Sequence, residues 1–323
     1  MRAESINLDA AVGKLLSAPI FHATGKKLFA KGHEVSVEDA RLLRSEGLEQ
    51  VLVAVLDEGE IPEEDAAVQI AAECGCGSME IRIAAGGRAN IFATENCCLL
   101  VDDYLLRKVN ESSCLTAATL PNFSFVAAGQ RLASIKSAPF AVGRSDFDQC
   151  VDLIRREGPL MQARPVRNAT VAVLYSDPLR ADRARTLFEG IMRTRLERFG
   201  VHASFVLACV EDQASIARHL EHLLRARPTL VLMASTTAPA GPEDEVGRGM
   251  TAAGCQMESF LAPVEPGNLL LLGYAGETPV VAAPGCFRSP KANVIDLILP
   301  PLLSRYRLSS VEIATLGHGG LLQ

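Results

Sequence analysis

The sequence predicts an α/β protein whose C-terminal half, residues 161–305, is a three-layer domain with a mostly parallel sheet. Two observations support this prediction. Strand-like and helix-like stretches alternate along the whole region. The strand-like stretches are apolar at nearly every position, which is typical of parallel strands buried on both faces. The expected strands are 170–175, 204–208, 229–234 and 278–283.

The first part of the chain, residues 1–160, reads as a mixed α/β region. Ser36 and Asp39 have capping-box spacing, so a helix is expected to run from there to Glu46 and to stop at Gly47. A short buried strand is expected at 51–55. Pro62 is expected at the first position of the next helix, where the missing N–H is tolerated.

Residues 80–142 predict a small β-rich lobe, because short β-type runs are punctuated by glycine, asparagine and proline. Within it, residues 125–135 read as strand, glycine turn, strand. A connecting helix is expected at 146–156, and the proline-containing stretch 158–168 is expected to be a linker. The lobe's expected strands are 80–84, 90–94, 98–101, 123–127 and 132–135.

Four helices are expected between and after the strands of the C-terminal half. The first carries Ala184, Leu187, Phe188 and Ile191 on one face, and the second carries Ile216, Leu220, Leu223 and Leu224. The others are expected at 242–253 and 292–304, followed by a tail at 306–323. In such sheets, ligands bind where loops leave the carboxyl ends of the strands.

Composition narrows the function classes. The 323 residues suggest two domains, and the net charge of −6 without a Lys/Arg-rich block predicts no nucleic-acid partner. No run of eighteen apolar residues and no signal-peptide pattern occurs, so we expect a cytoplasmic protein without membrane contact.

The nine cysteines are expected to be reduced and mostly buried. His219 and His222 have a spacing that could hold a metal, although a third ligand is not obvious.

The loops at the expected strand ends carry candidate ligand-binding residues. Small and hydroxyl residues allow close approach to backbone N–H groups, and a following helix N-terminus favours an anion. Arg288 and Lys291 would add positive charge, whereas Asp212 and Asp244 would suit a donor-rich ring or a metal ion. With Gly241 as N-cap, Asp244 would be the third residue of its helix. The alternative is a set of ordinary turns between strands and helices.

The order of these motifs, Ser176-Asp177, Asp212, Gly241-x-x-Asp244, Pro266-Gly267 and Pro284-Gly285, resembles the molybdopterin-binding domain. That domain occurs in molybdopterin adenylyltransferases, molybdopterin molybdotransferases and competence-damage-type proteins, and the resemblance covers about residues 166–305. The sequence departs from the family where Ser235-Thr236-Thr237 replaces a threonine and two glycines, and where Cys286-Phe287 replaces Asn-Pro. The N-terminal half lacks the molybdotransferase opening region, so the chain is similar to a divergent molybdopterin-binding subgroup.

The resemblance implies a role in molybdenum cofactor biosynthesis, in molybdate insertion or nucleotide-linked cofactor maturation. It implies Asp244 and Asp212 as catalytic and magnesium-binding residues of a molybdotransferase-like transferase. A carrier that hands over the cofactor without turnover and a nucleotide-pyrophosphate hydrolase are the alternatives. The implied pterin-binding residues are Ser176, Asp177, Ser235, Thr236, Thr237, Gly241, Pro266, Gly267, Pro284, Gly285, Cys286, Arg288, Ser289 and Lys291.

Two partners are implied by analogy with the same family. Relatives of this domain commonly assemble, so a homo-oligomer is expected. The tail 316–322 resembles the junction that precedes a cytidylyltransferase domain in some relatives. A separate cytidylyltransferase is therefore a possible partner of this chain.

Overall fold

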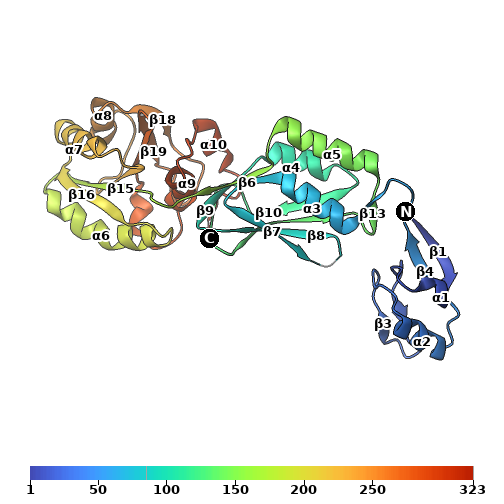
Figure 1. Cartoon of the computed structure of the whole chain (residues 1–323). Coiled ribbons are helices and arrows are strands. Elements are labelled where there is room, and N and C mark those ends of the chain that lie inside the picture. Colours follow the sequence, from blue (N-terminus) through green and yellow to red (C-terminus); the bar gives the residue numbers. More distant parts are fainter. Residues whose placement is uncertain (85, 323) are drawn as a thin grey trace. The chain divides into compact units, whose positions relative to one another are not determined.

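The computed structural model describes residues 1–84 and 86–322 and divides into two compact units (Figure 1). Unit 1 comprises Met1–Ala93, Val101–Leu120 and Gly129–Gln162. Unit 2 comprises Thr94–Leu100, Pro121–Ala128 and the chain from Ala163 onward. The chain therefore passes between the units several times.

Unit 1 begins with a small α/β segment. Strand β1 (Arg2–Asn7) pairs antiparallel with β4 (Gln50–Val55), and α1 (Leu8–Ala11) and α2 (Val37–Ser45) pack beside them over a shared apolar core. The Ser36–Asp39 capping box is confirmed, and Gly47 adopts φ +83° just beyond the helix. β2 (Ile20–Phe21) and β3 (Lys27–Phe29), which the sequence did not predict, form a short antiparallel pair.

The rest of unit 1 is a four-stranded antiparallel sheet with helices packed against it. The strand order is β10-β12-β8-β7, and α3 (Glu63–Cys74) contacts β7, β8 and β12. The sequence predicted Pro62 as the first residue of this helix, but in the structure Pro62 is the N-cap of α3. The other elements are β5 (Ile61–Pro62), β6 (Gly75–Gly77), β7 (Met79–Ala84), β8 (Arg88–Ala93), α4 (Asp103–Asn110), β10 (Leu115–Thr119), β12 (Arg131–Ser137), β13 (Ala141–Val142) and α5 (Arg144–Glu157).

One expectation for the middle of the chain is confirmed and another is wrong. Residues 125–135 form strand, glycine turn, strand, because Gly129 with φ +79° separates β11 (Ser124–Val126) from β12. These two strands do not pair with each other: β11 pairs with β9 (Cys97–Val101), and β12 pairs with β8 and β10. The predicted linker at 158–168 is wrong, because it contains a strand, β14 (Met161–Pro165), whose pairing depends on distant segments.

Unit 2 confirms the predicted α/β fold with a largely parallel sheet. Its six strands have the order β16-β15-β17-β20-β19-β18, and the first four run parallel. β18 and β19, which the sequence did not predict, extend the sheet antiparallel. The strands are β15 (Val171–Asp177), β16 (Ala203–Val210), β17 (Leu230–Ser235), β18 (Gln256–Phe260), β19 (Leu271–Ala275) and β20 (Thr278–Ala282).

Helices cover both faces of this sheet and complete the three layers. On one face, α6 (Ala181–Glu197) and α9 (Val294–Leu303) bury Val171, Val173 and Tyr175 of β15. On the other, α7 (Gln213–Arg225) and α8 (Glu245–Ala252) bury Ala172 and Leu174. This alternation along β15 is the two-residue period of a strand buried on both sides. A 3₁₀ turn, η1 (Gly285–Arg288), precedes α9, and α10 (Ser310–Thr315) lies in the C-terminal tail.

No helix within residues 1–84 and 86–322 is long and apolar enough to cross a membrane.

Candidate functional site at the carboxyl ends of the parallel strands

The topology of unit 2 points to one edge of its sheet. From β15 the chain passes through α6 to β16 on one side, and then through α7 to β17 on the other side of β15. The strand order therefore reverses between β15 and β17. At such a switch point the two following loops diverge, and ligands of open α/β sheets bind outside the carboxyl ends of those strands. Ser176 of β15 is opposite Ser235 of β17 at this end.

Asp177, the last residue of β15, is fully buried and accepts hydrogen bonds through both oxygens. Oδ1 accepts the backbone N–H groups of Leu179 (2.8 Å) and Arg180 (3.0 Å). Oδ2 accepts the Thr236 hydroxyl at 2.7 Å and lies 3.2 Å from Nη1 of Arg183.

The surroundings of Asp177 keep it ionised. Burial raises its pKa, but the hydrogen bonds from the Arg180 N–H, the Thr236 hydroxyl and the Leu179 N–H, together with the Arg183 charge, outweigh burial. The pKa of Asp177 is therefore held below its usual value. The carboxylate joins the loop after β15 to the loop after β17.

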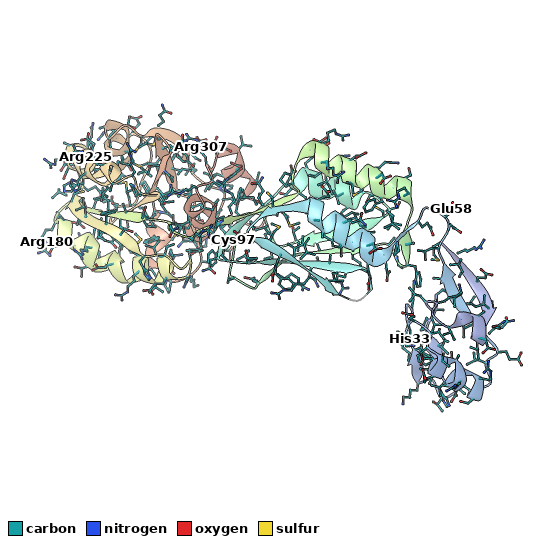
Figure 2. The ribbon with its side chains drawn as sticks, in the orientation of Figure 1. His33, Glu58, Cys97, Arg180, Arg225 and Arg307 are labelled. Carbon is teal, nitrogen blue, oxygen red and sulfur yellow. The ribbon has the colours of Figure 1, made fainter. Side chains whose placement is uncertain are left out.

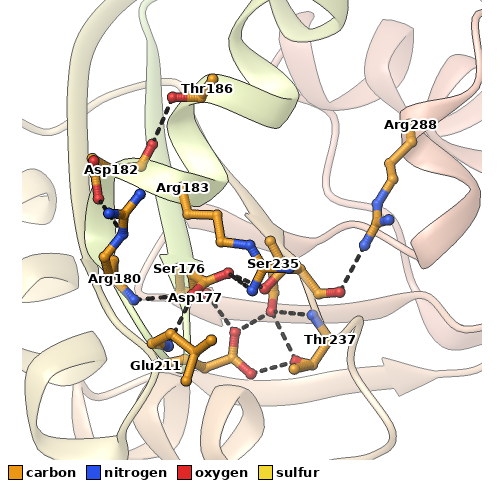
Figure 3. Close-up of polar contacts among 12 residues, drawn as sticks. Ser176, Asp177, Arg180, Asp182, Arg183, Thr186, Glu211, Ser235, Thr237 and Arg288 are labelled. Atoms are coloured by element: carbon orange, nitrogen blue, oxygen red, sulfur yellow. Dashed lines mark hydrogen bonds and ion pairs between the residues drawn. The ribbon is translucent and has the colours of Figure 1, made fainter.

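Glu211, directly after β16, is the centre of a second set of contacts (Figure 3). Its carboxylate accepts the hydroxyl of Ser176 at 3.0 Å, and also the hydroxyls of Ser235 and Thr237. Three strand ends thus converge on a single carboxylate. The Ser235 oxygen also accepts the Thr237 N–H at 3.2 Å. The Ser176 and Thr237 hydroxyls donate inward to Glu211, so their oxygen lone pairs can accept hydrogen bonds from a ligand.

Positive charge borders this carboxylate-centred network. Arg183, on the first turn of α6, is about half exposed, and Arg288 donates from Nη2 to the Thr236 carbonyl at 2.8 Å (Figure 3). The side chain of Arg180 projects at the surface of unit 2 (Figure 2). The N-terminus of α6 also faces the loop after β15, where a helix dipole favours an anion. The site therefore combines acceptors for a donor-rich group with cations for an anionic group.

The loop after β20 is held by a buried arginine. Arg195 of α6 is 1% exposed, pairs with Asp296 of α9, and donates to the carbonyls of Ser289 (2.8 Å) and Lys291 (3.3 Å). Its guanidinium lies 5.1 Å from the centre of the Phe287 ring. These contacts position the segment that brings Arg288 to Thr236.

Pro266 and Gly267 lie beside the start of α9. The Val294 N–H donates to the Pro266 carbonyl at 3.3 Å. A Cβ on Gly267, which has φ +131°, would come within 2.7 Å of the Val294 side chain. Only glycine fits there without moving α9.

Asp212 and Asp244 act as helix caps. Asp212 Oδ1 accepts the Ser215 N–H at 2.8 Å at the start of α7. Asp244 is the N-cap of α8 and accepts the Gly247 and Ala240 N–H groups through its two oxygens. Its expected place as third helical residue is therefore wrong, and so is Gly241 as N-cap. Within residues 1–84 and 86–322, no group of three or more His, Cys, Asp and Glu side chains is arranged to hold a metal ion.

The structure thus joins many of the residues singled out from the sequence. Ser176, Ser235 and Thr237 donate to Glu211, Thr236 donates to Asp177, and Arg288 reaches the Thr236 carbonyl. Gly285 lies close to the loop after β17, because a Cβ there would be 3.4 Å from that of Ala238. Cys286 is half-buried, and Lys291 is exposed.

Sequence reasoning missed three residues that organise the site: Glu211, Arg183 and Arg195. Glu211 had a signal, because it lies three residues after the end of the predicted strand 204–208. Arg183 and Arg195 belong to scattered arginines of an expected helix, and the sequence pattern does not distinguish them from solvent-exposed ones. Arg195 lies in the last turn of α6, on the side that faces α9, and only the packing of these two helices shows this.

No family model matches this chain, and neither does any curated protein. Solved structures of molybdenum cofactor biosynthesis proteins resemble it. One is a molybdopterin biosynthesis protein, MoeA, from Pyrococcus horikosii, with 14% identity, 76% of this chain and 79% of that chain covered, and a TM-score of 0.33. Another is a molybdenum cofactor biosynthesis protein from Pyrococcus furiosus, with 12% identity, 94% of this chain covered and a TM-score of 0.23; the match spans 64% of that protein. Likenesses at these values do not assign a function.

Proposed function

We propose that the carboxyl end of the unit 2 sheet binds a molybdopterin-type ligand in molybdenum cofactor biosynthesis. The observation that carries the proposal is the hydroxyl–carboxylate network around Glu211 at the switch point between β15 and β17. A pterin ring carries amino and ring N–H donors along one edge. Hydroxyl oxygens that already donate to Glu211 are suited to accept from such an edge.

The cations beside this network suit the other end of the ligand. Molybdopterin carries a phosphate, and Arg183, Arg288 and the α6 N-terminus supply donors and positive potential for it. Within this one site, the hydroxyl oxygens are therefore complementary to the donor-rich ring, and the arginines and the α6 N-terminus are complementary to the phosphate. A simple phosphate site would not need the buried carboxylates, which repel an anion.

Molybdate insertion is the step that we propose for this site, by positioning and charge stabilisation. Mg²⁺ is commonly bound by one or two carboxylates together with substrate phosphates, and Asp212 is the exposed carboxylate nearest in sequence to Glu211. Hand-over without turnover remains the competing function. It is favoured by Ser235-Thr236-Thr237, since side chains there restrict backbone approach more than glycines do.

The decisive experiment measures pterin affinity of Glu211→Gln against the wild type. Glutamine keeps the size; its Oε1 can accept the Ser176 and Ser235 hydroxyls and its amide N–H can donate to the Thr237 oxygen, so the fold should persist. Loss of the charge removes charge-assisted contacts worth about 1.5–3 kcal/mol, which is roughly a 10- to 150-fold weaker affinity. Glu221→Gln, on the exposed surface of α7, is the matched control. Equal pterin affinity for both variants would refute the proposal.

A second variant tests the phosphate end. Replacing both Arg288 and Lys291 with glutamine should weaken binding of the phosphorylated pterin by about 1–3 kcal/mol. Binding of the dephosphorylated pterin should change little. Measuring whether the wild type consumes molybdate in the presence of Mg²⁺ then separates insertion, which requires turnover, from hand-over, which does not.

A further inference from the structure

The four-stranded sheet of unit 1, β10-β12-β8-β7, has a covered face and an open face. Helices α3 and α4 pack on the covered face (Figure 1), where Ala89, Ile91 and Ile135 are fully buried. Because successive side chains of a strand point to opposite faces, the residues between these lie on the open face. On β8 and β10, and on β12 from Ser134 onward, they are half-buried or exposed, so this face is accessible to a ligand.

Two cations stand directly opposite each other on the open face. Lys136 of β12 is in register with Arg88 of β8 on one side and with Thr116 of β10 on the other. Side chains paired in this way have Cβ atoms about 4.5–5.5 Å apart, and like charges there destabilise a sheet. Within residues 1–84 and 86–322, neither cationic side chain has a hydrogen bond or ion pair that offsets this repulsion. An anion bound between them would replace the repulsion by two attractions.

These three side chains line a hollow of about 450 Å³ that lies entirely within unit 1. The next pair along the strands, Ala118 and Ser134, also lines it, and their small side chains leave the space between the longer ones. Arg131 is a third cation in the lining and donates from Nη1 to Oδ1 of Asn90 at 3.4 Å. Among the described residues, no acidic side chain lines this hollow.

The charge of the whole open face is positive. Arg82 of β7 adds a fourth cation and forms an ion pair with Glu80, which is the one acidic residue in the described sequence of the four strands. The chain as a whole carries a net charge of −6, so this face is a local exception. A concentration of one sign of charge in a hollow attracts ligands of the opposite sign.

The groups of the hollow suit a phosphate on a small molecule better than they suit nucleic acid. Lysine, arginine and hydroxyl groups donate to phosphate oxygens, and about 300–1,000 Å³ is typical of small-molecule sites. Sheets that bind single-stranded nucleic acid offer aromatic rings on which bases stack. Phe92 is the one aromatic residue in the described strands β7, β8, β10 and β12, and the Arg82 guanidinium already lies 4.3 Å from its ring centre.

We propose that this hollow binds the phosphate group of a small molecule, held between Lys136 and Arg88 with the Thr116 hydroxyl as a further donor. The site belongs to unit 1 and does not depend on the function proposed for unit 2. A ligand that binds only the folded protein stabilises it. Removing one of the two cations therefore has opposite effects: it relieves repulsion in the free protein, and it removes contacts from the complex.

Titration of the ¹⁵N-labelled full chain with inorganic phosphate and with AMP, followed by NMR at constant ionic strength, tests the proposal. The amide signals of Arg88, Thr116 and Lys136 should shift on binding. Arg88→Gln and Lys136→Gln should each weaken the affinity by about 10-fold or more. Lys27→Gln, on the exposed strand β3 of the same unit, is the matched control and should bind as wild type does. Tighter binding of AMP assigns the hollow to a phosphate ester, and equal or weaker binding assigns it to free phosphate.

Thermal melts followed by circular dichroism separate binding from folding. Without ligand, Lys136→Gln should melt about 1–2 °C above wild type, because the repulsion with Arg88 is gone. Phosphate should then raise the melting temperature of wild type and of Lys27→Gln, but not that of Lys136→Gln.

Three results would overturn the proposal. The first is equal phosphate affinity of Lys136→Gln and Lys27→Gln. The second is a stabilisation by phosphate that sodium chloride reproduces at the same ionic strength, because charge screening alone would then explain it. The third is a single-stranded oligonucleotide that binds this face more tightly than AMP, with an affinity that rises with its length, which would make the face a nucleic-acid interface.

Discussion

Asp177→Asn is the perturbation whose magnitude follows most directly from the structure. Asparagine retains Oδ1 for the backbone N–H groups of Leu179 and Arg180, but puts an amide donor in place of Oδ2. The Thr236 hydroxyl can rotate to accept from that amide, whereas Arg183 cannot.

The expected loss of stability can be worked out from these contacts. Hydrogen bonds to a charged group contribute about 1.5–3 kcal/mol, and neutral ones about 0.5–1.5 kcal/mol. Three bonds therefore weaken by about 1 kcal/mol each, and the lower desolvation penalty of a neutral amide offsets part of this. We expect the free energy of unfolding to fall by about 2 kcal/mol at pH 7. The Arg183 pair adds little because that guanidinium is about half exposed.

The effect should depend on pH with a defined sign. Because the folded-state pKa of Asp177 is lowered from 3.8, the ionised carboxylate stabilises the fold above that value. The stabilisation is lost as the pH falls through the lower folded-state pKa. The difference between wild type and Asp177→Asn should therefore be complete at pH 7 and shrink below about pH 4.

Urea unfolding followed by circular dichroism between pH 3 and pH 7 measures this difference, since the chain has no tryptophan. Asp182→Asn is the control, because its carboxylate is 74% exposed and 3.6 Å from Arg180. A difference that stays constant with pH, or an Asp177→Asn protein as stable as wild type at pH 7, would refute the reasoning.

Three further variants test other parts of unit 2. Asp244→Ala should lower the unfolding free energy by about 1 kcal/mol through loss of the α8 cap, as seen in thermal melts; unchanged stability with lost pterin affinity would instead assign Asp244 to the ligand. Gly267→Ala should destabilise by more than the roughly 1 kcal/mol expected for Gly276→Ala, whose φ is +60° but whose Cβ meets open space; equal melting temperatures would contradict the packing at α9. Arg195→Met should cost about 3 kcal/mol in urea unfolding, because it removes the buried guanidinium from the part-buried Asp296 carboxylate and from the carbonyls of Ser289 and Lys291; a loss below 1 kcal/mol would show that the pair is unimportant.

Much of the unit 2 fold could be predicted from local sequence patterns. The strands β15, β16, β17 and β20 and the helices between them follow from apolar runs and helical periodicity. The predicted ends are off by a few residues, since α8 begins at Glu245 and not at Pro242. The expected positions of the strand-end loops also follow, because parallel strands place their carboxyl ends at one edge.

Part of the fold could not be predicted in this way. β18 lacks the apolar run that marks the parallel strands, and its place at the sheet edge comes from antiparallel pairing with β19. β19 begins within the apolar run at residues 269–272, and its direction is fixed by antiparallel pairing with β20. Pairing likewise separates β11 from β12. Strand pairing is decided by contacts between distant segments, which a local pattern does not contain.

For the candidate site, the sequence by itself determined which residue types follow each strand: hydroxyls and acids after β15, β16 and β17, and basic residues after β20. Only the tertiary structure decided their roles. Glu211 gathers three hydroxyls because three strand ends meet, while Asp244 turns both oxygens to its own helix. A carboxylate's partner is set by distances of about 3 Å between chain segments that lie far apart in sequence, and packing alone creates those distances.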